Sequence, residues 1–408
     1  MALSPREELA SATMLATHEV IKVITRSNAT FEELLRSMHD LCCLITTDGR
    51  ILWGNHVASV WLGCPIDKIH EHNLLALFDE QAKAKFIEAV SSRSKGSVNA
   101  ESIKQPLLEI VLKVQIDGKE RSQLWSFSRF KPKHKDRRGV IVLVSASDIT
   151  ETLSAQSAAA KFESELETAQ LIQQAFLPPT FKDLPDYTVA AFYRPADQCS
   201  GDWWGHFDLG NDCDLVCIVD VTGHGVASAL VTAMTQATCM TFARRAKRHK
   251  TTGASALLDE LNLVIYETFK GSIQMTCSVM VFDRKNKIVR YSSAAHPAPL
   301  LLTHSSGTLS SLDCPSDPLG YSADSKYPEK FFALKPNTTV FLYTDGLTEG
   351  RNLSEKMYGN KRLRKSLVEH AKEESLSKFL DLSIADAFTF FENAQIKDDI
   401  TVVALRTK

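Results

Sequence analysis

The sequence predicts an α+β protein in which antiparallel sheets carry helices on their outer faces. Three observations lead to this fold class. The chain has 408 residues, which is too long for one ordinary core and favours two domains. Strand-like runs follow one another on both sides of a helical segment at residues 151–180. Because hairpins outnumber strand–helix–strand units among these runs, antiparallel pairing is favoured over a parallel sheet.

The composition is that of a soluble globular protein, with 44% hydrophobic and 24% charged residues. A net charge of −2 gives no global field that would attract nucleic acid, so no nucleic-acid partner is expected. The nine cysteines form no Cys-x-x-Cys pair and lie mostly in apolar runs. This pattern favours buried, reduced thiols over a disulfide framework or a zinc site.

The N-terminus has no basic segment followed by an apolar one, so we expect a cytoplasmic protein and not a secreted one. Residues 221–243 are long enough and apolar enough to cross a bilayer. They include Gly223-His224-Gly225 and several Thr, Ser and Gln residues, and their apolar positions follow helical spacing. We interpret them as a helix buried on most sides of a globular core and expect no membrane partner.

The first half of the chain predicts a helix at 1–28 and an antiparallel sheet domain at 29–150. Two strands and short helices precede three further strands in this domain, at 41–45, 51–55, 108–116, 123–130 and 139–147. This order resembles a PAS domain, and the motifs that carry the resemblance are Asp48-Gly49-Arg50-Ile51, Asn55 and Asp148-Ile149-Thr150-Glu151.

The PAS resemblance implies a sensor or dimerisation module, and we predict no cofactor for it. The cysteine motif of flavin-binding relatives is not visible after Asn55. His70 and His72 lie where a haem-binding relative would place its axial histidine. A single helix histidine is far more often a surface residue than an iron ligand.

Residues 151–180 predict a helical linker with a heptad seam. Its seam positions are spaced alternately by four and three, at Ala155, Ala159, Phe162, Leu166, Ala169, Gln173 and Phe176. The helix either packs on its own domain or forms a parallel coiled coil between two protomers. About three alanine-rich heptads bury little surface, so an isolated coiled coil would be marginal. The two folded domains that it joins nevertheless favour a homodimer.

The second half, 181–408, alternates strands with a few long helices. Helices are expected at 254–269, 363–371 and 377–391. Strands are expected at 187–193, 214–221, 276–283, 287–293, 298–303, 338–344 and 399–406.

Four short acidic motifs lie at the ends of apolar runs in this half: Ser200-Gly201-Asp202, Asp220-Val221-Thr222-Gly223-His224-Gly225, Tyr343-Thr344-Asp345-Gly346 and Asp398-Asp399-Ile400-Thr401. Strands that begin or end at an Asp bring carboxylates to one rim of a sheet. Such hard oxygen ligands suit Mg²⁺ or Mn²⁺, and two ions would activate water for attack on phosphorus. One Asp beside a Gly is usually a cap or turn residue, but four such motifs together favour a metal site.

In this half the sequence resembles the SpoIIE/RsbU-type branch of the metal-dependent PPM serine/threonine phosphatases. The resemblance covers all of 181–408 and rests on the four acidic motifs together with three others: residues 172–178, 193–196 and 294–300. It implies an αββα sandwich and hydrolysis of phosphoserine or phosphothreonine on a partner protein. It also implies a substrate such as a STAS-type anti-sigma-factor antagonist, with the PAS-like domain regulating the reaction.

The resemblance assigns roles by position. Asp220 would be shared by both metals, with the carbonyl of Val221 beside it, and Asp345 and Asp398 would be ligands on opposite sides of the pair. Asp202 would hold the centre through a metal or its waters. Asp399 is a further candidate for the metal site and ranks below the others, because its position can be outside the ligand shell.

The roles of three further residues are less specific. His224 is either catalytic, as a general acid or as a partner of Asp220, or it only holds its loop in place. His296 is expected to support a strand end, and Arg194 either contacts the substrate phosphate or is structural. Two departures from the family pattern are visible: Ser200 replaces a glycine, and Gly205 stands where an acidic residue is common.

Two rival functions fit the sequence less well than the phosphatase. A non-catalytic signalling scaffold of the same fold would be marked by the loss of an Asp ligand, and none is lost. A nucleotide-dependent phosphotransferase would need a phosphate-binding loop of the Gly-x-x-x-x-Gly-Lys-Ser/Thr type or kinase motifs, and the sequence contains neither.

Overall fold

A computed structural model describes residues 38–94, 108–116, 118–130, 140–223, 225–249, 253–333 and 335–408. The chain divides into two compact units, Met1–Lys161 and Phe162–Lys408. The helix predicted over 1–28 lies outside the described residues.

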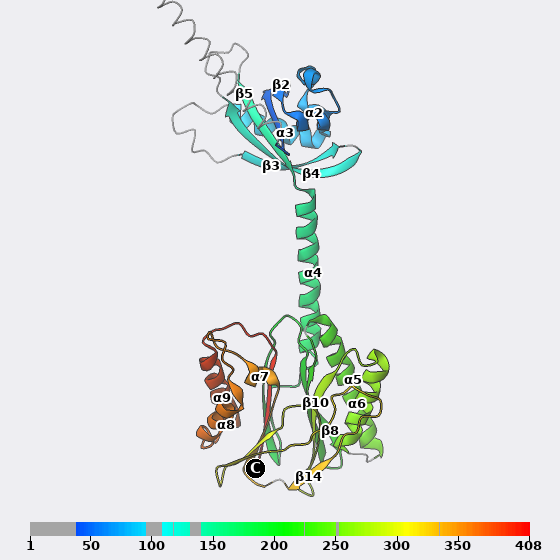
Figure 1. The fold of residues 1–408 in the computed structure, drawn as a ribbon, viewed down its shortest axis with the longest axis vertical. Coiled ribbons are helices and arrows are strands. Elements are labelled where there is room, and N and C mark those ends of the chain that lie inside the picture. The colour runs from blue at the N-terminus through cyan, green and yellow to red at the C-terminus, as the bar shows by residue number, and fades with distance from the viewer. Residues whose placement is uncertain are drawn as a thin grey trace, which may run out of the picture. The chain divides into compact units, whose positions relative to one another are not determined.

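The first unit is built on a five-stranded antiparallel sheet with the strand order β2-β1-β5-β4-β3 (Figure 1). Its elements are β1 (Leu41–Thr46), β2 (Ile51–Gly54), α2 (His56–Leu62), η1 (Ile66–Glu71), η2 (Leu74–Leu77), α3 (Glu80–Ser94), β3 (Leu108–Ile116), β4 (Lys119–Phe130) and β5 (Ile141–Asp148). All five strands predicted from the sequence are present, and β4 begins four residues earlier than expected.

The motif residues of this unit shape its turns. Gly49 has a φ of +85°, which glycine adopts without the strain that a side chain would bring, and it turns β1 into β2. Asn55 caps α2, because its side-chain oxygen accepts hydrogen bonds from the backbone N–H groups of Ala58 (3.2 Å) and Cys42 (3.1 Å). Asp148 accepts one from the backbone N–H of Thr150 at 3.0 Å, which begins the helix that follows.

The core of the first unit lies between the sheet and its helices, and aromatic rings fill it. Trp125 of β4 packs edge-on against Phe86 of α3 and against Phe78. Gln123, two residues before Trp125 on the same strand, is fully buried, and both polar atoms of its side chain lack a hydrogen-bond partner among the described residues. A buried amide of this kind costs free energy unless it is paired.

The second unit is a sandwich of two antiparallel sheets, ordered β14-β11-β10-β9-β8 and β13-β12-β15-β16-β7-β6. Its helices after α4 (Thr150–Gln174) are α5 (Val226–His249), α6 (Ala254–Phe269), α7 (Asp345–Glu349), α8 (Gly359–Glu369) and α9 (Leu376–Phe391). Its strands are β6 (Phe181–Asp183), β7 (Tyr187–Arg194), β8 (Asp202–Gly210), β9 (Cys213–Val221), β10 (Met275–Asp283), β11 (Ile288–Ala294), β12 (Leu300–Thr303), β13 (Thr308–Ser311), β14 (Lys330–Ala333), β15 (Thr338–Tyr343) and β16 (Ile400–Thr407).

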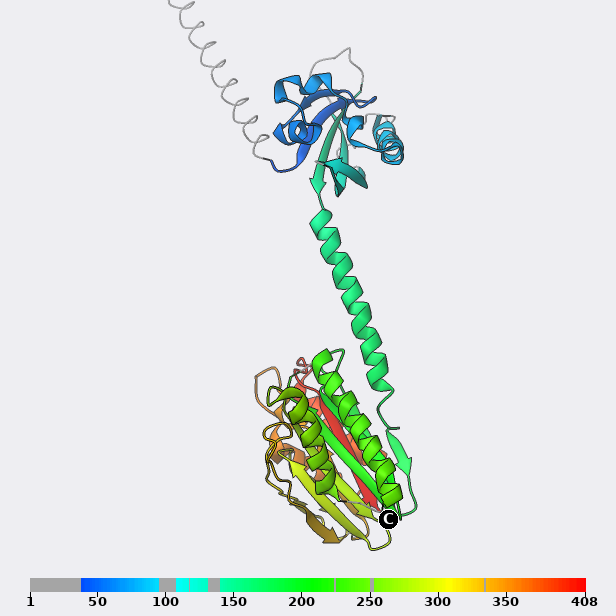
Figure 2. The ribbon, with the colours of Figure 1, turned by 90° about the vertical axis from the view of Figure 1, so that its right-hand side faces the viewer.

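Helices cover both outer faces of this sandwich, with α5 and α6 on one sheet and α8 and α9 on the other (Figures 1 and 2). Large side chains from both sheets, including Trp204, Phe282 and Val403, fill the space between them. The predicted α+β class with an αββα sandwich is therefore confirmed.

Helix α5 is the helix expected within residues 221–243, and the prediction that it is buried on most sides is wrong. Its inner face, including Val231, Thr235 and Phe242, packs on the first sheet. Its outer face exposes Val226 and Leu230, and only 39% of its most apolar 18-residue stretch is buried. Among the described helices, α5 alone is long and apolar enough to cross a membrane by length and composition.

Helix α4 (Thr150–Gln174) is the predicted linker helix, and the structure corrects its heptad seam. Phe162 in the middle of the seam is 61% exposed. Gln173 and Phe176 at its end cannot form a seam with a second chain, because both pack against their own chain. Gln173 is buried in the second unit, and Phe176 lies beyond the end of the helix and packs on the core beneath α5 and α6.

Candidate metal centre

Four segments bring their carboxylates to one end of the sandwich. Asp202 begins β8 and lies directly opposite Asp220, the next-to-last residue of β9. Asp345 begins α7, immediately after β15 and Thr344. Asp398 and Asp399 immediately precede β16, which pairs antiparallel with β15. The start of one strand and the end of its antiparallel neighbour share an edge, so all four motifs reach the same rim.

Asp220 stands among other carboxylates. Burial and then repulsion from Asp345 and Asp398 raise its pKa to about 8. Asp345 lies within hydrogen-bonding reach of it. A carboxyl whose neighbours are acids gains no stabilisation from them when it ionises, so this position favours a bound cation.

Asp202 is the most deeply buried of these acids, at 2% exposure. Burial and repulsion from Asp220 raise its pKa well above the usual value. One of its oxygens accepts a hydrogen bond from the Thr344 hydroxyl at 2.7 Å, and that hydroxyl also accepts one from the backbone N–H of Thr401 at 2.9 Å. Thr344 thus joins three of the four acidic motifs.

Asp399 has both oxygens engaged by the protein itself. They accept hydrogen bonds from the backbone N–H groups of Ala196 and Gly201, each at 2.8 Å. Asp399 therefore holds the segment that leads into Asp202. These bonds agree with the interpretation that it lies outside the ligand shell.

Asp398 is more open. One of its oxygens accepts the backbone N–H of Asp399 at 2.9 Å. Partial burial raises its pKa, and the nearby charges of Asp345, Asp399 and Glu349 add to the effect. Sequence reasoning missed Glu349. It lies one helical turn after Asp345 on α7, a spacing that puts both side chains on one face and could have revealed it.

The oxygen donors of this rim fit divalent cations. The Oδ1 atom of Asp345 is buried and has no hydrogen-bond partner among the described residues. Within that part of the chain, no three Asp, Glu, His or Cys side chains already form a ligand set for one ion. A set of three is not required for Mg²⁺, which is typically held by one or two carboxylates while it keeps several waters.

Glycines allow the motifs to approach one another. A Cβ atom on Gly346 would lie 2.0 Å from the Asp399 carbonyl oxygen, and one on Gly201 would lie 2.8 Å from that of Val221. Gly223 and Gly225 have φ angles of +94° and +86°. Backbone of this kind excludes larger residues, which explains why glycine flanks the carboxylates.

The two departures from the family pattern have local causes. A Cβ atom on Gly205 would lie 2.4 Å from the ring of Trp203 and 2.6 Å from that of Phe207. An acidic side chain does not fit between these rings. Ser200 is fully buried, and its hydroxyl accepts the backbone N–H of Asp202 at 3.0 Å, so it supports the loop that a glycine would otherwise form.

The remaining predicted residues lie in different settings. His224 is outside the described residues. His296 is buried, its Nδ1 atom lies 2.7 Å from the Thr276 hydroxyl, and burial lowers its pKa to about 3. Thr276 is the strand partner of Asp220, so His296 packs beneath the rim. Arg194 places its guanidinium over the ring of Phe388, 4.8 Å from the centroid.

Gln173, at the end of α4, is a further residue whose role sequence reasoning missed. Its amide donates hydrogen bonds to the Ser200 carbonyl (2.7 Å) and the Thr232 hydroxyl of α5 (3.1 Å). Its amide oxygen accepts the backbone N–H of Ser200 at 3.0 Å. One buried side chain therefore fastens the linker helix to the loop before Asp202 and to α5.

Comparisons with known proteins agree with this geometry. Residues 211–408 match the family model of stage II sporulation protein E (SpoIIE). Protein IcfG of Synechocystis sp. is 26% identical over 263 residues, which are 59% of this chain and 41% of IcfG. The phosphoserine phosphatase RsbU of Bacillus subtilis is 26% identical over 248 residues, which are 61% of this chain and 71% of RsbU.

A solved structure shows the fold. The SiaA PP2C domain of Pseudomonas aeruginosa is similar with a TM-score of 0.53 and 21% sequence identity. The match covers 62% of this chain and 99% of that domain. The second unit therefore has the PP2C fold. The chain spans less than half the length of IcfG, so the likeness to IcfG concerns a part of that protein.

Proposed function

Residues 211–408 belong to the SpoIIE family of PP2C-type phosphatase domains, and from that premise we propose that this chain is a metal-dependent phosphoprotein phosphatase. Its substrate would be phosphoserine or phosphothreonine on a partner protein. The observation that carries the proposal is the cluster of acids around Asp220, whose pKa burial and neighbouring carboxylates raise to about 8.

We propose that two Mn²⁺ or Mg²⁺ ions are held by Asp220, the carbonyl of Val221, Asp345 and Asp398, with Asp202 holding the centre directly or through waters. Such ions, when bound, activate water and neutralise charge on the phosphoryl oxygens. The Oδ1 of Asp345, which has no hydrogen-bond partner in the described part of the chain, supports its role as a ligand.

The protein's own groups would fix the geometry of this centre. Thr344 orients Asp202 by donating to its carboxylate. Asp399 positions the Gly201 backbone through its hydrogen bond. Neither residue needs to ionise or move during the reaction, so both act as positioning residues. A catalytic role for His224 remains part of the proposal, as general acid or as partner of Asp220.

The partner that we propose is a phosphorylated signalling protein in the cytoplasm, of the STAS-type anti-sigma-factor antagonist class. The name of the relative RsbU, a phosphoserine phosphatase, supports the choice of phosphoserine. The first unit would serve as a PAS-like regulatory module, and the exposed part of the α4 seam, around Phe162, would join two protomers.

Control would reach the metal centre through Gln173. Helix α4 starts directly after β5 of the first unit, and Gln173 in its last turn binds the backbone of Ser200, two residues before Asp202. A rotation of α4 that broke these bonds would leave buried polar groups unpaired and release the Asp202 loop.

Replacement of one ligand tests the proposal. Asp345→Asn keeps the size of the side chain but removes the charge of a group whose Oδ1 has no hydrogen-bond partner among the residues that the structure describes. We expect phosphate release from a phosphoserine protein in Mn²⁺ to fall below detection while circular dichroism stays unchanged. Full activity in the variant would contradict the proposal. Mn²⁺ binding without phosphate release by the wild-type chain would favour the scaffold alternative.

A further inference from the structure

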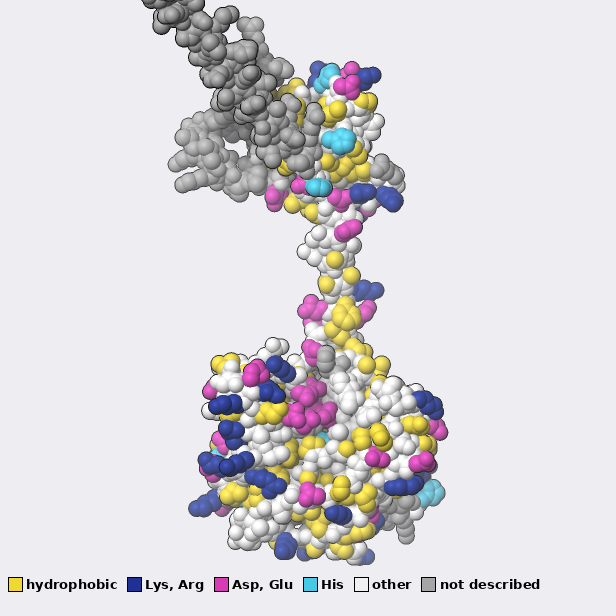
Figure 3. Space-filling view, viewed as in Figure 1, with side chains coloured by type: hydrophobic (Ala, Val, Ile, Leu, Met, Phe, Trp, Pro, Cys, Tyr) yellow, Lys and Arg dark blue, Asp and Glu magenta, His cyan; other side chains and the backbone are white. Residues whose placement is uncertain are grey.

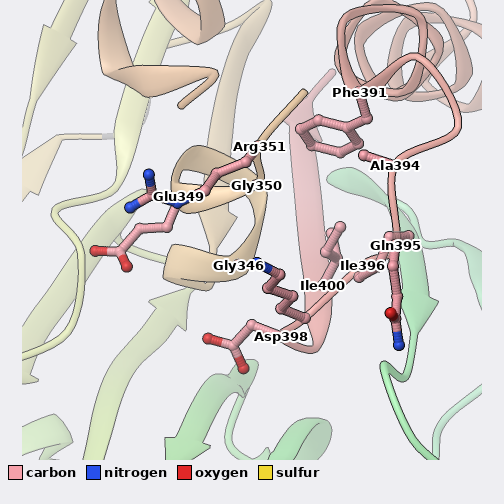
Figure 4. Close-up of a pocket in the computed structure, with 11 residues that line it drawn as sticks. Gly346, Glu349, Gly350, Arg351, Phe391, Ala394, Gln395, Ile396, Asp398 and Ile400 are labelled. Carbon is pink, nitrogen blue, oxygen red and sulfur yellow. The ribbon is translucent and has the colours of Figure 1, made fainter. Parts of the chain in front are cut away.

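A cavity of about 210 Å³ lies directly beside Asp398 in the second unit. One side is formed by the end of α7, with Gly346 and Glu349. The other side is formed by the segment between α9 and β16, from Phe391 to Asp398 (Figure 4). The carboxylates of Asp398 and Glu349 point to the same side in this view. Anything bound in the cavity would therefore lie next to the proposed metal ligand.

The inner walls of the cavity are apolar. Phe391 and Ile400 are almost fully buried and belong to the core beneath α8 and α9. Ile396 stands beside them and is half-buried (Figure 4). The volume is below the roughly 300–1,000 Å³ of pockets that take drug-sized ligands. A pocket of this size and lining suits one apolar side chain.

The shape of the cavity is fixed by close packing at Gly350. A Cβ atom there would lie 2.5 Å from the Cζ atom of Phe391, so only glycine lets the ring stand against the end of α7. Phe391 also packs on Phe388 and Tyr358. A wall held in this way is preformed, and a bound side chain would not have to order it.

The rim of the cavity carries side chains of both charges, with Glu349 and Asp398 beside the proposed metal centre and Arg351 and Lys397 around the remainder. Arg351 and Lys397 line it from opposite sides, and both are exposed. Each forms a long, solvent-exposed ion pair with Glu355, at 3.9 Å and 3.7 Å, and such pairs contribute little. Figure 3 shows further Lys and Arg side chains over α8 and α9, on the same face as the acidic patch beside α7. A negatively charged phosphoprotein segment complements the basic side chains over α8 and α9, while Glu349 and Asp398 lie on the metal side of the cavity.

We propose that this cavity is the specificity pocket of the phosphatase and that it takes an apolar side chain within two positions of the phosphoserine in the partner protein. The proposal rests on the proposed function. It makes Ile396 and Ala394 determinants of substrate choice, whereas the acidic motifs perform the chemistry.

The test compares substrates on the full chain with Mn²⁺. Four phosphoserine peptides each carry one Leu, at position −2, −1, +1 or +2, in an otherwise Gly/Ser sequence, and a fifth carries none. We expect kcat/KM for at least one Leu peptide to exceed that of the fifth by about tenfold, the effect of burying one Leu side chain. Equal values for all five peptides would overturn the proposal.

A variant whose cavity is filled by a larger side chain provides the second part of the test. Ala394→Phe places a ring in the cavity and should remove the preference for Leu through a loss on the Leu peptide. The matched control, Ala237→Phe on the exposed face of α5, should keep it. If Ala394→Phe keeps the preference, the pocket is not the determinant.

p-Nitrophenyl phosphate separates the two hypotheses, because it presents no side chain to the pocket. If the wild-type chain releases phosphate neither from it nor from the peptides, the proposed function fails. If the chain releases phosphate but treats the five peptides alike, only the pocket fails.

Discussion

Strand β9 carries two aspartates, Asp214 near its start and Asp220 near its end, and their surroundings differ. Asp214 accepts a hydrogen bond from the Tyr187 hydroxyl at 2.9 Å and lies 3.2 Å from the Arg284 guanidinium. Asp220 meets the carboxylates of Asp202 and Asp345. A buried carboxylate that has its own donors is complete within the fold, whereas one that meets only acids needs a cation from outside.

The largest effect expected from this comparison is on catalysis. Asp220→Asn should reduce Mn²⁺-dependent phosphate release by more than about 100-fold, because even partners outside the ligand shell of metal sites cost 10–100-fold. Asp214→Asn should keep most of the activity. Steady-state rates of both variants on one phosphoserine peptide measure the contrast, and equal losses would remove the distinction between the two aspartates.

The effects on the stability of the fold should be reversed, with the loss in Asp214→Asn and not in Asp220→Asn. Asp214→Asn weakens charge-assisted bonds of a residue that is 4% exposed, and we expect a loss of about 1.5–3 kcal/mol in the free energy of unfolding. In the absence of metal, Asp220→Asn should raise the melting temperature, because folding then no longer has to protonate this carboxyl or to bury its charge among other acids. Thermal melts in EDTA measure both. A fall in the melting temperature of Asp220→Asn would argue against repulsion at the rim.

The pH dependence of the metal-free protein should follow Asp220. Its folded pKa of about 8 lies above the usual 3.8, so between these values the folded chain holds a proton that the unfolded chain has lost. Raising the pH removes that proton and lowers the free energy of unfolding. His206 and His296, whose pKa values burial lowers to about 4 and about 3, are neutral in both states above about pH 7.

Between pH 7 and pH 9 the buried cysteines also contribute, because burial raises the pKa of thiols such as Cys43 and Cys277 that ionise in the unfolded chain. In EDTA the melting temperature should fall across this window, and it should fall less in Asp220→Asn, so the difference between the two proteins reports the acidic rim. Saturating Mn²⁺ should reduce the decline of the wild type, since the cation binds the ionised carboxylates. A melting temperature that rises with pH in EDTA would contradict the assignment.

A smaller effect on catalysis is expected at Gln173. Like Asp214, it is a buried polar side chain whose partners belong to the protein itself. Gln173→Leu would leave the backbone of Ser200 without its partners, and we expect about a tenfold fall in kcat/KM together with weaker Mn²⁺ binding. Gln174→Leu, at the adjacent exposed position, is the matched control. If both variants behave alike, Gln173 does not connect α4 with the metal centre.

The smallest effect is expected in the first unit, at Gln123. Its buried amide has no partner among the described residues, so Gln123→Leu removes an unpaired polar group. The free energy of unfolding of that unit should rise or stay within about 1 kcal/mol of the wild type. A loss of several kcal/mol in denaturant titrations would reveal a partner for this amide.

Much of the fold could be predicted because its strands are continuous apolar runs between clear turns. The strand predicted at 108–116 matches β3, and the helix predicted at 254–269 matches α6. Strand β8, Asp202–Gly210, was missed because Gly205, His206 and Asp208 interrupt its apolar residues, so it shows neither a continuous apolar run nor a regular alternation. The short strands β13 and β14 offer four residues each, too few for a pattern.

The candidate site shows the same limit. The four acidic motifs could be found from the chain because each lies at the end of an apolar run. The partners of Asp399 and of Gln173 could not, since Ala196 and Ser200 are far from them in sequence and act through backbone groups. Backbone donors leave no residue-type signal. The heptad pattern therefore assigned Gln173 to a seam when it faces its own domain.

Calorimetric titration of Mn²⁺ into the metal-free full chain tests the central claim most directly. We predict two binding equivalents for the wild type and for Asp214→Asn, and loss of at least one equivalent for Asp220→Asn. Absence of Mn²⁺ uptake by the wild type, or unchanged uptake by Asp220→Asn, would contradict the account.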